Sequence, residues 1–160
     1  MAAKALFLTL TLTLALLLGG CGTFGTKAPT SGAAPTAMPL TPDNVAKVRA
    51  SVTAAKAKAP RVESRDDYVR LARSVYVASW AGPYNAAATT ETALAQAKAG
   101  NATAREYLVI MVYDLQLQTA MEGKTLSAED WQAVYVGSGI MTDAAYAGYV
   151  EMARGGKMLP

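Results

Sequence analysis

The chain has 160 residues, a hydrophobic fraction of 52% and a formal net charge of +3. It contains no histidine and one cysteine, Cys21, which excludes an internal disulfide and argues against histidine-dependent hydrolase triads and zinc sites. The small excess of positive charge does not predict nucleic-acid binding, and we expect no metal, no cofactor and no catalytic residue.

The first segment has the pattern of an export signal. Residues 1–4 carry one positive charge at Lys4, and residues 5–18 are uncharged and apolar, a run too short to span a bilayer comfortably as a permanent helix. Leu18, Gly19, Gly20 and Cys21 follow at once. These four residues resemble the lipobox of bacterial lipoproteins, although Gly19 stands where alanine, serine or threonine is more usual. The alternative is an ordinary secretory signal beside which Cys21 has no role.

The resemblance implies that a diacylglycerol is attached to the Cys21 thiol, that the leader is cut between Gly20 and Cys21, and that the new amino terminus is acylated. It also implies a membrane as the first partner. The next residue is Gly22 rather than the aspartate that commonly retains lipoproteins in the inner membrane. We therefore expect the periplasmic face of the outer membrane or, in a Gram-positive host, the outer face of the cytoplasmic membrane.

Residues 22–41 are rich in Gly, Pro, Ser, Thr and Ala and carry one charge. Such a composition does not build a core, and twenty such residues have a root-mean-square reach of roughly 25 Å. The expected organisation is a signal over residues 1–20, a lipidated cysteine and linker over 21–41, and a helical domain over 42–160.

Two helices are expected early in the domain. The first should run from Pro42 to about residue 59, because Thr41 is a good cap, a proline suits the first turn and valines follow at helical spacing. The second should begin at Ser64, which forms a capping box with Asp67, and end near Trp80.

The middle of the domain predicts an alanine-rich helix over 85–99 and a central buried helix over 103–122. Thr103 and Glu106 have the spacing of a capping box, and residues 107–113 leave no polar face. The β-branched residues 109, 110 and 112 and the alternation at 115–118 would also suit a strand. Length and the capping box favour the helix.

A capping box at Ser127 and a further cap at Thr142 open two last helices, the second ending at Arg154. The chain thus predicts an all-α, bundle-like domain of five or six helices behind a disordered tether.

Asp114 is the most unusual acid, because it lies in the most apolar helix. We expect a structural ion pair, with Arg105 or another arginine as partner, or partial exposure. The other acids and Ser138 have ordinary explanations at helix ends.

The early part of the domain is basic. Residues 45–73 carry eight positive and three negative side chains. Such a surface, with aromatic residues near helix ends, could contact a partner or anionic lipid, although a simple solvated face is the plainer reading. The candidate partner surface comprises Arg49, Lys56, Arg65, Arg70, Trp80 and Tyr84, and we expect Trp131 to lie in the core.

Three functions are consistent with these features. The first is a membrane-anchored, non-enzymatic interaction or assembly accessory protein with a protein partner in the cell envelope. The second is an inhibitor or exclusion lipoprotein that protects the envelope. The third is a cell-wall enzyme that works through carboxylates alone, with Glu106 and Asp114 as its candidates.

Overall fold

The computed structural model describes residues 35–156, which form six continuous helices with no strand among them. The all-α prediction is therefore confirmed. Two of the six helices contain a π-helical stretch, labelled η. The elements are α1 (Pro42–Lys56), α2 (Arg65–Leu71), η1 (Ala72–Val77), α3 (Ala86–Lys98), α4 (Ala102–Leu108), η2 (Val109–Tyr113), α5 (Asp114–Met121), α6 (Ala128–Ser138) and α7 (Asp143–Arg154).

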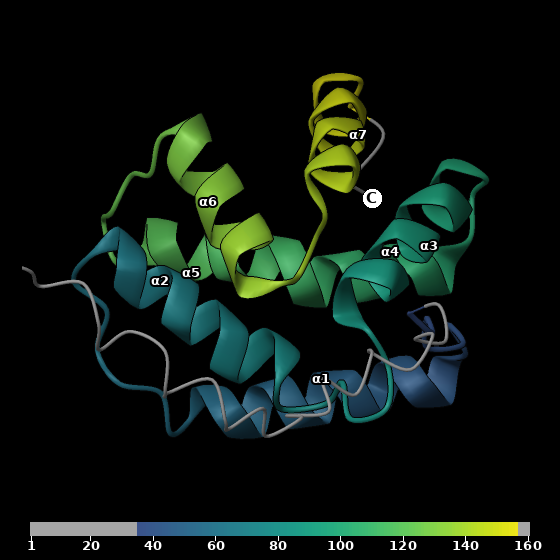
Figure 1. Cartoon of the computed structure of the whole chain (residues 1–160), viewed down its shortest axis with the longest axis horizontal. Coiled ribbons are helices and arrows are strands. Elements are labelled where there is room, and N and C mark those ends of the chain that lie inside the picture. The colour runs from purple at the N-terminus through teal and green to yellow at the C-terminus, as the bar shows by residue number, and fades with distance from the viewer. Residues whose placement is uncertain (1–34, 157–160) are drawn as a thin grey trace, which may run out of the picture. The chain divides into compact units, whose positions relative to one another are not determined.

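The helix formed by α4, η2 and α5 runs through the middle of the domain (Figure 1). On one side it packs against α1, while α3 packs against α4 and α7, and α6 packs against α2, η1 and α7. Residues 107–118 are thus helical, and the strand alternative is excluded. The central position of this helix, as expected, lets it contribute buried side chains to the core, among them Tyr107, Met111 and Leu115.

Local capping explains where most helices begin. Thr41 accepts a hydrogen bond from the backbone of Asn44, and both predicted capping boxes, at Ser64 and at Ser127, are present. The capping box predicted at Thr103 is wrong. Asn101 is extended and accepts from Ala104 N at 3.1 Å instead, so the helix begins at Ala102, before Thr103.

The packed domain begins before residue 42. Met38 is only 5% exposed, and its backbone N–H donates to Thr89 Oγ1 at 2.9 Å. The carbonyl of Thr36 accepts from the backbone of Asn85 at 2.9 Å. The sequence assigned these residues to the linker because the segment as a whole is poor in large apolar side chains, yet one buried methionine and two hydrogen bonds attach its end to α3.

The signal over residues 1–20, Cys21 and the linker up to residue 34 lie outside the described residues, as do residues 157–160. Among the helices that are described, none combines the length and the apolar character needed to cross a bilayer.

Candidate functional site

A polar network joins three helices and includes a residue of η1 and the residue that directly follows η2. Asp114 directly follows η2, and its Oδ2 accepts from Tyr76 Oη at 2.8 Å and from Lys56 Nζ at 2.7 Å. Tyr76 belongs to η1 and is fully buried, whereas the Lys56 and Asp114 side chains are 30% and 34% exposed. π-Helical insertions are rare and occur frequently at functional sites, which directs attention to this junction.

The expected partner of Asp114 was an arginine, Arg105 or another. The partner is Lys56, which lies 58 residues earlier on α1. Arg105 precedes Asp114 by nine residues on the same helix, a spacing of roughly 13 Å along the axis, so it cannot form the pair. The expectation of a structural ion pair is therefore met, with a different cation.

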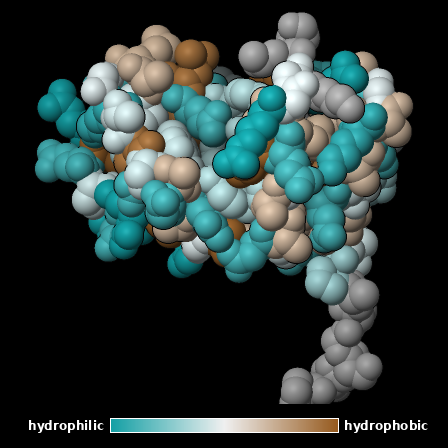
Figure 2. Space-filling view, turned by 90° about the horizontal axis from the view of Figure 1, so that it is seen from above, coloured by the Kyte–Doolittle hydropathy of each residue, from teal (hydrophilic) through white to brown (hydrophobic). Residues whose placement is uncertain are grey.

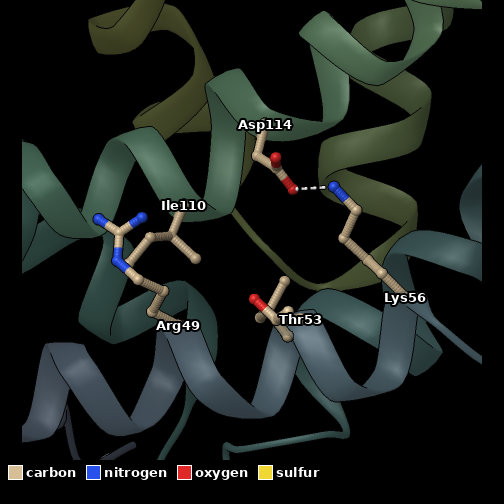
Figure 3. Close-up of a pocket in the computed structure, with 6 residues that line it drawn as sticks. Arg49, Thr53, Lys56, Ile110 and Asp114 are labelled. Atoms are coloured by element: carbon tan, nitrogen blue, oxygen red, sulfur yellow. Dashed lines mark hydrogen bonds and ion pairs between the residues drawn. The ribbon is translucent and has the colours of Figure 1, made fainter.

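A small pocket of about 130 Å³ lies between α1 and the central helix, next to this network. Figure 3 shows Arg49 and Lys56 extending from α1 at the two ends of the pocket, with Thr53 and Ile110 between them. Arg49 pairs with Glu106 at 2.9 Å, at a more exposed position than the Lys56–Asp114 pair. Of the two candidate carboxylates of the enzyme hypothesis, Asp114 lines this pocket and Glu106 does not. Each is paired with a cation of α1.

The arrangement of these two acids suits cross-linking of helices better than acid–base chemistry. Glu106 and Asp114 are eight residues apart on one helix, which separates them by roughly 10–12 Å along its axis. Glycoside hydrolases hold their two carboxyl groups about 5–9.5 Å apart. Burial, followed by the neighbouring charge of Asp114, raises the pKa of Tyr76, so its hydroxyl stays protonated and donates to the carboxylate.

A larger groove of about 350 Å³ lies beside the amino-terminal half of α1. Trp80 and Tyr84 line it together with polar residues of α1, which are Asn44, Lys47 and Ser51, and with Ser79, which follows η1. Trp80 Nε1 donates to the carbonyl of Tyr76 at 2.7 Å, and the indole meets the Tyr107 ring edge to face, with centroids 5.8 Å apart. The Trp80 ring is therefore held in one orientation.

The six residues of the candidate partner surface do not all line one pocket. Arg49 and Lys56 border the small pocket, and Trp80 and Tyr84 border the larger groove. Arg65 and Arg70 are on α2. That the six residues together contact a partner stays a prediction.

The two arginines of α2 are paired with acids. Arg65 contacts Asp66 at 3.5 Å and Asp130 of α6 at 3.8 Å, and Arg70 pairs with Asp67. Hydrogen bonds from the Ser64 side chain and backbone, with a smaller effect of Arg70, lower the pKa of Asp67 to about 2. Much of the positive charge of the early helices is thus compensated within the domain.

The sequence did not anticipate an aromatic cluster between α6 and α7. Trp131 stacks on Tyr135 with centroids 5.4 Å apart, and Tyr135, Tyr146 and Tyr149 are mutually 6.2 Å apart. Trp131 is half-buried and packs against the core, close to what was expected. These rings lie on two helices at helical spacing, and in the sequence this pattern is the same as that of ordinary core residues.

The carboxy-terminal part of the central helix exposes two large apolar side chains, contrary to the expectation of burial. Leu117 is 61% exposed and Met121 is 80% exposed, one turn apart on α5. Hydrophilic and intermediate residues cover most of the face seen in Figure 2, where hydrophobic residues appear as small separate patches. Within residues 35–156, no three acidic side chains come together in a cluster that could hold a metal ion.

No protein-family model, no curated protein and no solved structure matches this chain. The functional inference therefore depends on the residues of this chain alone.

Proposed function

We propose that this protein is an exported lipoprotein, anchored to a membrane through Cys21, whose helical domain binds another protein of the cell envelope and catalyses no reaction. The observation that carries the anchoring is the order of the first 21 residues. An uncharged apolar stretch ends at Leu18, Gly19 and Gly20, directly before the single cysteine of the chain. The two acyl groups of the lipid and the amino-terminal acyl group make such an anchor stable, where one chain would be marginal.

The proposed site is the periplasmic face of the outer membrane, because Gly22 follows the cysteine. In a Gram-positive host the same anchor holds the domain on the outer face of the cytoplasmic membrane. The residues between Cys21 and the first packed residues at 36–38 give the domain room to meet a partner away from the lipid surface.

Leu117 and Met121 support a protein partner. Both project from α5 to solvent one turn apart, and Met is enriched at the cores of protein interfaces, where its flexible side chain adapts to the opposing surface. The carboxylates that a wall-cleaving enzyme would need are already paired with Arg49 and Lys56. This pairing favours a structural role for Glu106 and Asp114.

Proximity labelling from the anchored protein in its native cell tests the proposal. We expect a small set of envelope proteins to be labelled, and Cys21→Ser to release the protein from the membrane and lose them. Replacing both Leu117 and Met121 by serine should abolish labelling while the protein stays anchored. Ala120→Ser, at an exposed position on the same helix, is the matched control and should label as the unmodified chain does.

Two results would contradict the proposal. If Cys21→Ser stays on the membrane, the protein is not anchored through a lipid on Cys21. If the anchored chain labels no protein above background, the domain has no protein partner in the envelope.

A further inference from the structure

Two aromatic residues that the core does not fully cover line the groove beside α1. Trp80 and Tyr84 are both half-buried and both line it. The indole is fixed by its bond to the Tyr76 carbonyl and by the Tyr107 ring. At about 350 Å³, the groove falls in the size range of small-molecule sites, roughly 300–1,000 Å³.

Neutral polar side chains also line the groove. The Asn44 amide donates to the carbonyl of Pro39 at 2.9 Å, which leaves its Oδ1 without a partner among residues 35–156. Ser51 has no side-chain hydrogen bond in that range, and Ser79 uses its hydroxyl as a donor to the Val75 carbonyl while its oxygen can still accept. These groups offer both donors and acceptors to a ligand rich in hydroxyls.

The groove carries one uncompensated charge. Lys47 lines it, is exposed and forms no ion pair with any described residue, and no acidic side chain is among the lining residues. Farther along α1, Arg49 and Lys56 are already paired with acids. A ligand that fills this groove is therefore expected to carry a single negative group near Lys47.

We infer that this groove binds a saccharide that carries a carboxylate. The apolar face of a sugar ring packs on Trp80 and Tyr84, its hydroxyls pair with the serine and asparagine side chains, and its carboxylate pairs with Lys47. Binding of an anionic membrane surface is the weaker reading, since such surfaces are recognised by clusters of about four to eight basic residues rather than by one.

The choice of test ligand rests on the proposed location in the cell envelope, where the disaccharide of N-acetylglucosamine and N-acetylmuramic acid provides both the sugar ring and the carboxylate. Because the chain has two tryptophans, Trp131→Phe makes Trp80 the only indole reporter. The full chain with this substitution, in detergent, is titrated with the disaccharide while Trp80 fluorescence is recorded.

We expect a saturable change in Trp80 emission. Lys47→Gln should weaken binding about tenfold, which corresponds to about 1.4 kcal/mol, and Tyr84→Leu should weaken it several-fold. Lys58→Gln is the matched control, since Lys58 is an exposed lysine just after α1 and outside the groove, and it should stay within about twofold of the parent. Di-N-acetylchitobiose, which is neutral, should bind as weakly as the carboxylated sugar binds to Lys47→Gln.

Circular dichroism of each variant separates loss of binding from loss of folding. The inference is overturned if the carboxylated disaccharide produces no saturable change. It is also overturned if Lys58→Gln weakens binding as much as Lys47→Gln, or if phosphatidylglycerol vesicles shift Trp80 emission while the sugar does not. None of these results bears on whether Cys21 is lipidated, so the anchoring proposal stands or fails separately.

Discussion

Replacement of Asp114 by alanine tests how the junction of α1, η1 and the central helix is held. The Asp114 carboxylate accepts from Tyr76, which is fully buried, and from Lys56, which is 30% exposed. Asp114→Ala removes the only acceptor of the buried hydroxyl among the described residues. Water can replace the carboxylate at Lys56, because that side chain already reaches solvent.

The two partners therefore contribute unequally. A buried hydroxyl left without an acceptor costs about 1–3 kcal/mol, whereas an ion pair with solvent access contributes about 1 kcal/mol or less. We expect Asp114→Ala to lower the free energy of unfolding by about 2 kcal/mol and Tyr76→Phe to lower it by about 1 kcal/mol. The double variant should be less stable than Tyr76→Phe by about 1 kcal/mol or less, the contribution of the lost ion pair, because no unpaired hydroxyl remains.

Urea unfolding of the full chain in detergent, followed by circular dichroism, measures these values. With a urea m-value of about 2 kcal/mol/M, the Asp114→Ala midpoint should fall by about 1 M. Glu106→Ala is the control, since it breaks the exposed pair with Arg49, and it should cost less than about 1 kcal/mol. Additive effects of Tyr76→Phe and Asp114→Ala, or a midpoint unchanged by Asp114→Ala, would show that the Tyr76 hydroxyl does not depend on Asp114 as its acceptor.

Three further predictions concern pH and the backbone. Burial raises the pKa of Tyr107, and it raises the pKa of Tyr149 to about 12. The stability that Tyr149 contributes is therefore complete below pH 10 and is lost as pH rises through 12. Absorbance at 295 nm, which reports tyrosine ionisation, should rise together with unfolding. Ionisation of every tyrosine near pH 10 while the protein remains folded would contradict the raised pKa values. The lowered pKa of Asp67 contributes stability above pH 3.8 that is lost as pH falls towards 2. Asp67→Asn should remove that pH dependence from urea midpoints, and an unchanged dependence would show that another acid is responsible. Gly139 ends α6 with φ +86°, so Gly139→Ala should cost about 1 kcal/mol in a thermal melt, and an unchanged melting temperature would argue against this backbone strain.

The sequence predicted where most helices begin because capping is local. Ser64 and Asp67 are three residues apart, and their mutual bonds depend on nothing else in the fold. Asn101 and Thr103 are both residue types that can cap a helix, and they lie within three residues of each other. Asn101 is the cap because its backbone is extended, and helical spacing in the sequence does not specify which of the two residues has that conformation.

The π-helical stretches and the pairs across helices were not predictable in this way. η1 and η2 continue their helices without a break, so no stop signal in the sequence marks them. The pairing of Lys56 with Asp114 depends on how α1 lies against the central helix.

The aromatic groove illustrates the same limit. Trp80 and Tyr84 could be recognised as residues near helix ends, with core or surface left open. Their proximity to Lys47 and to the neutral side chains of α1 follows from packing of α1 beside the turn before α3. To predict such a site from sequence, one would need to know which face of α1 packs against the turn before α3.

The mass of the mature protein extracted from membranes shows whether Cys21 is its lipidated amino terminus. We expect a chain that begins at Cys21, carries the added mass of a diacylglycerol and an amino-terminal acyl group, and leaves the membrane fraction when Cys21 is replaced by serine. A mature chain that begins elsewhere, or one that begins at Cys21 without lipid, would contradict it.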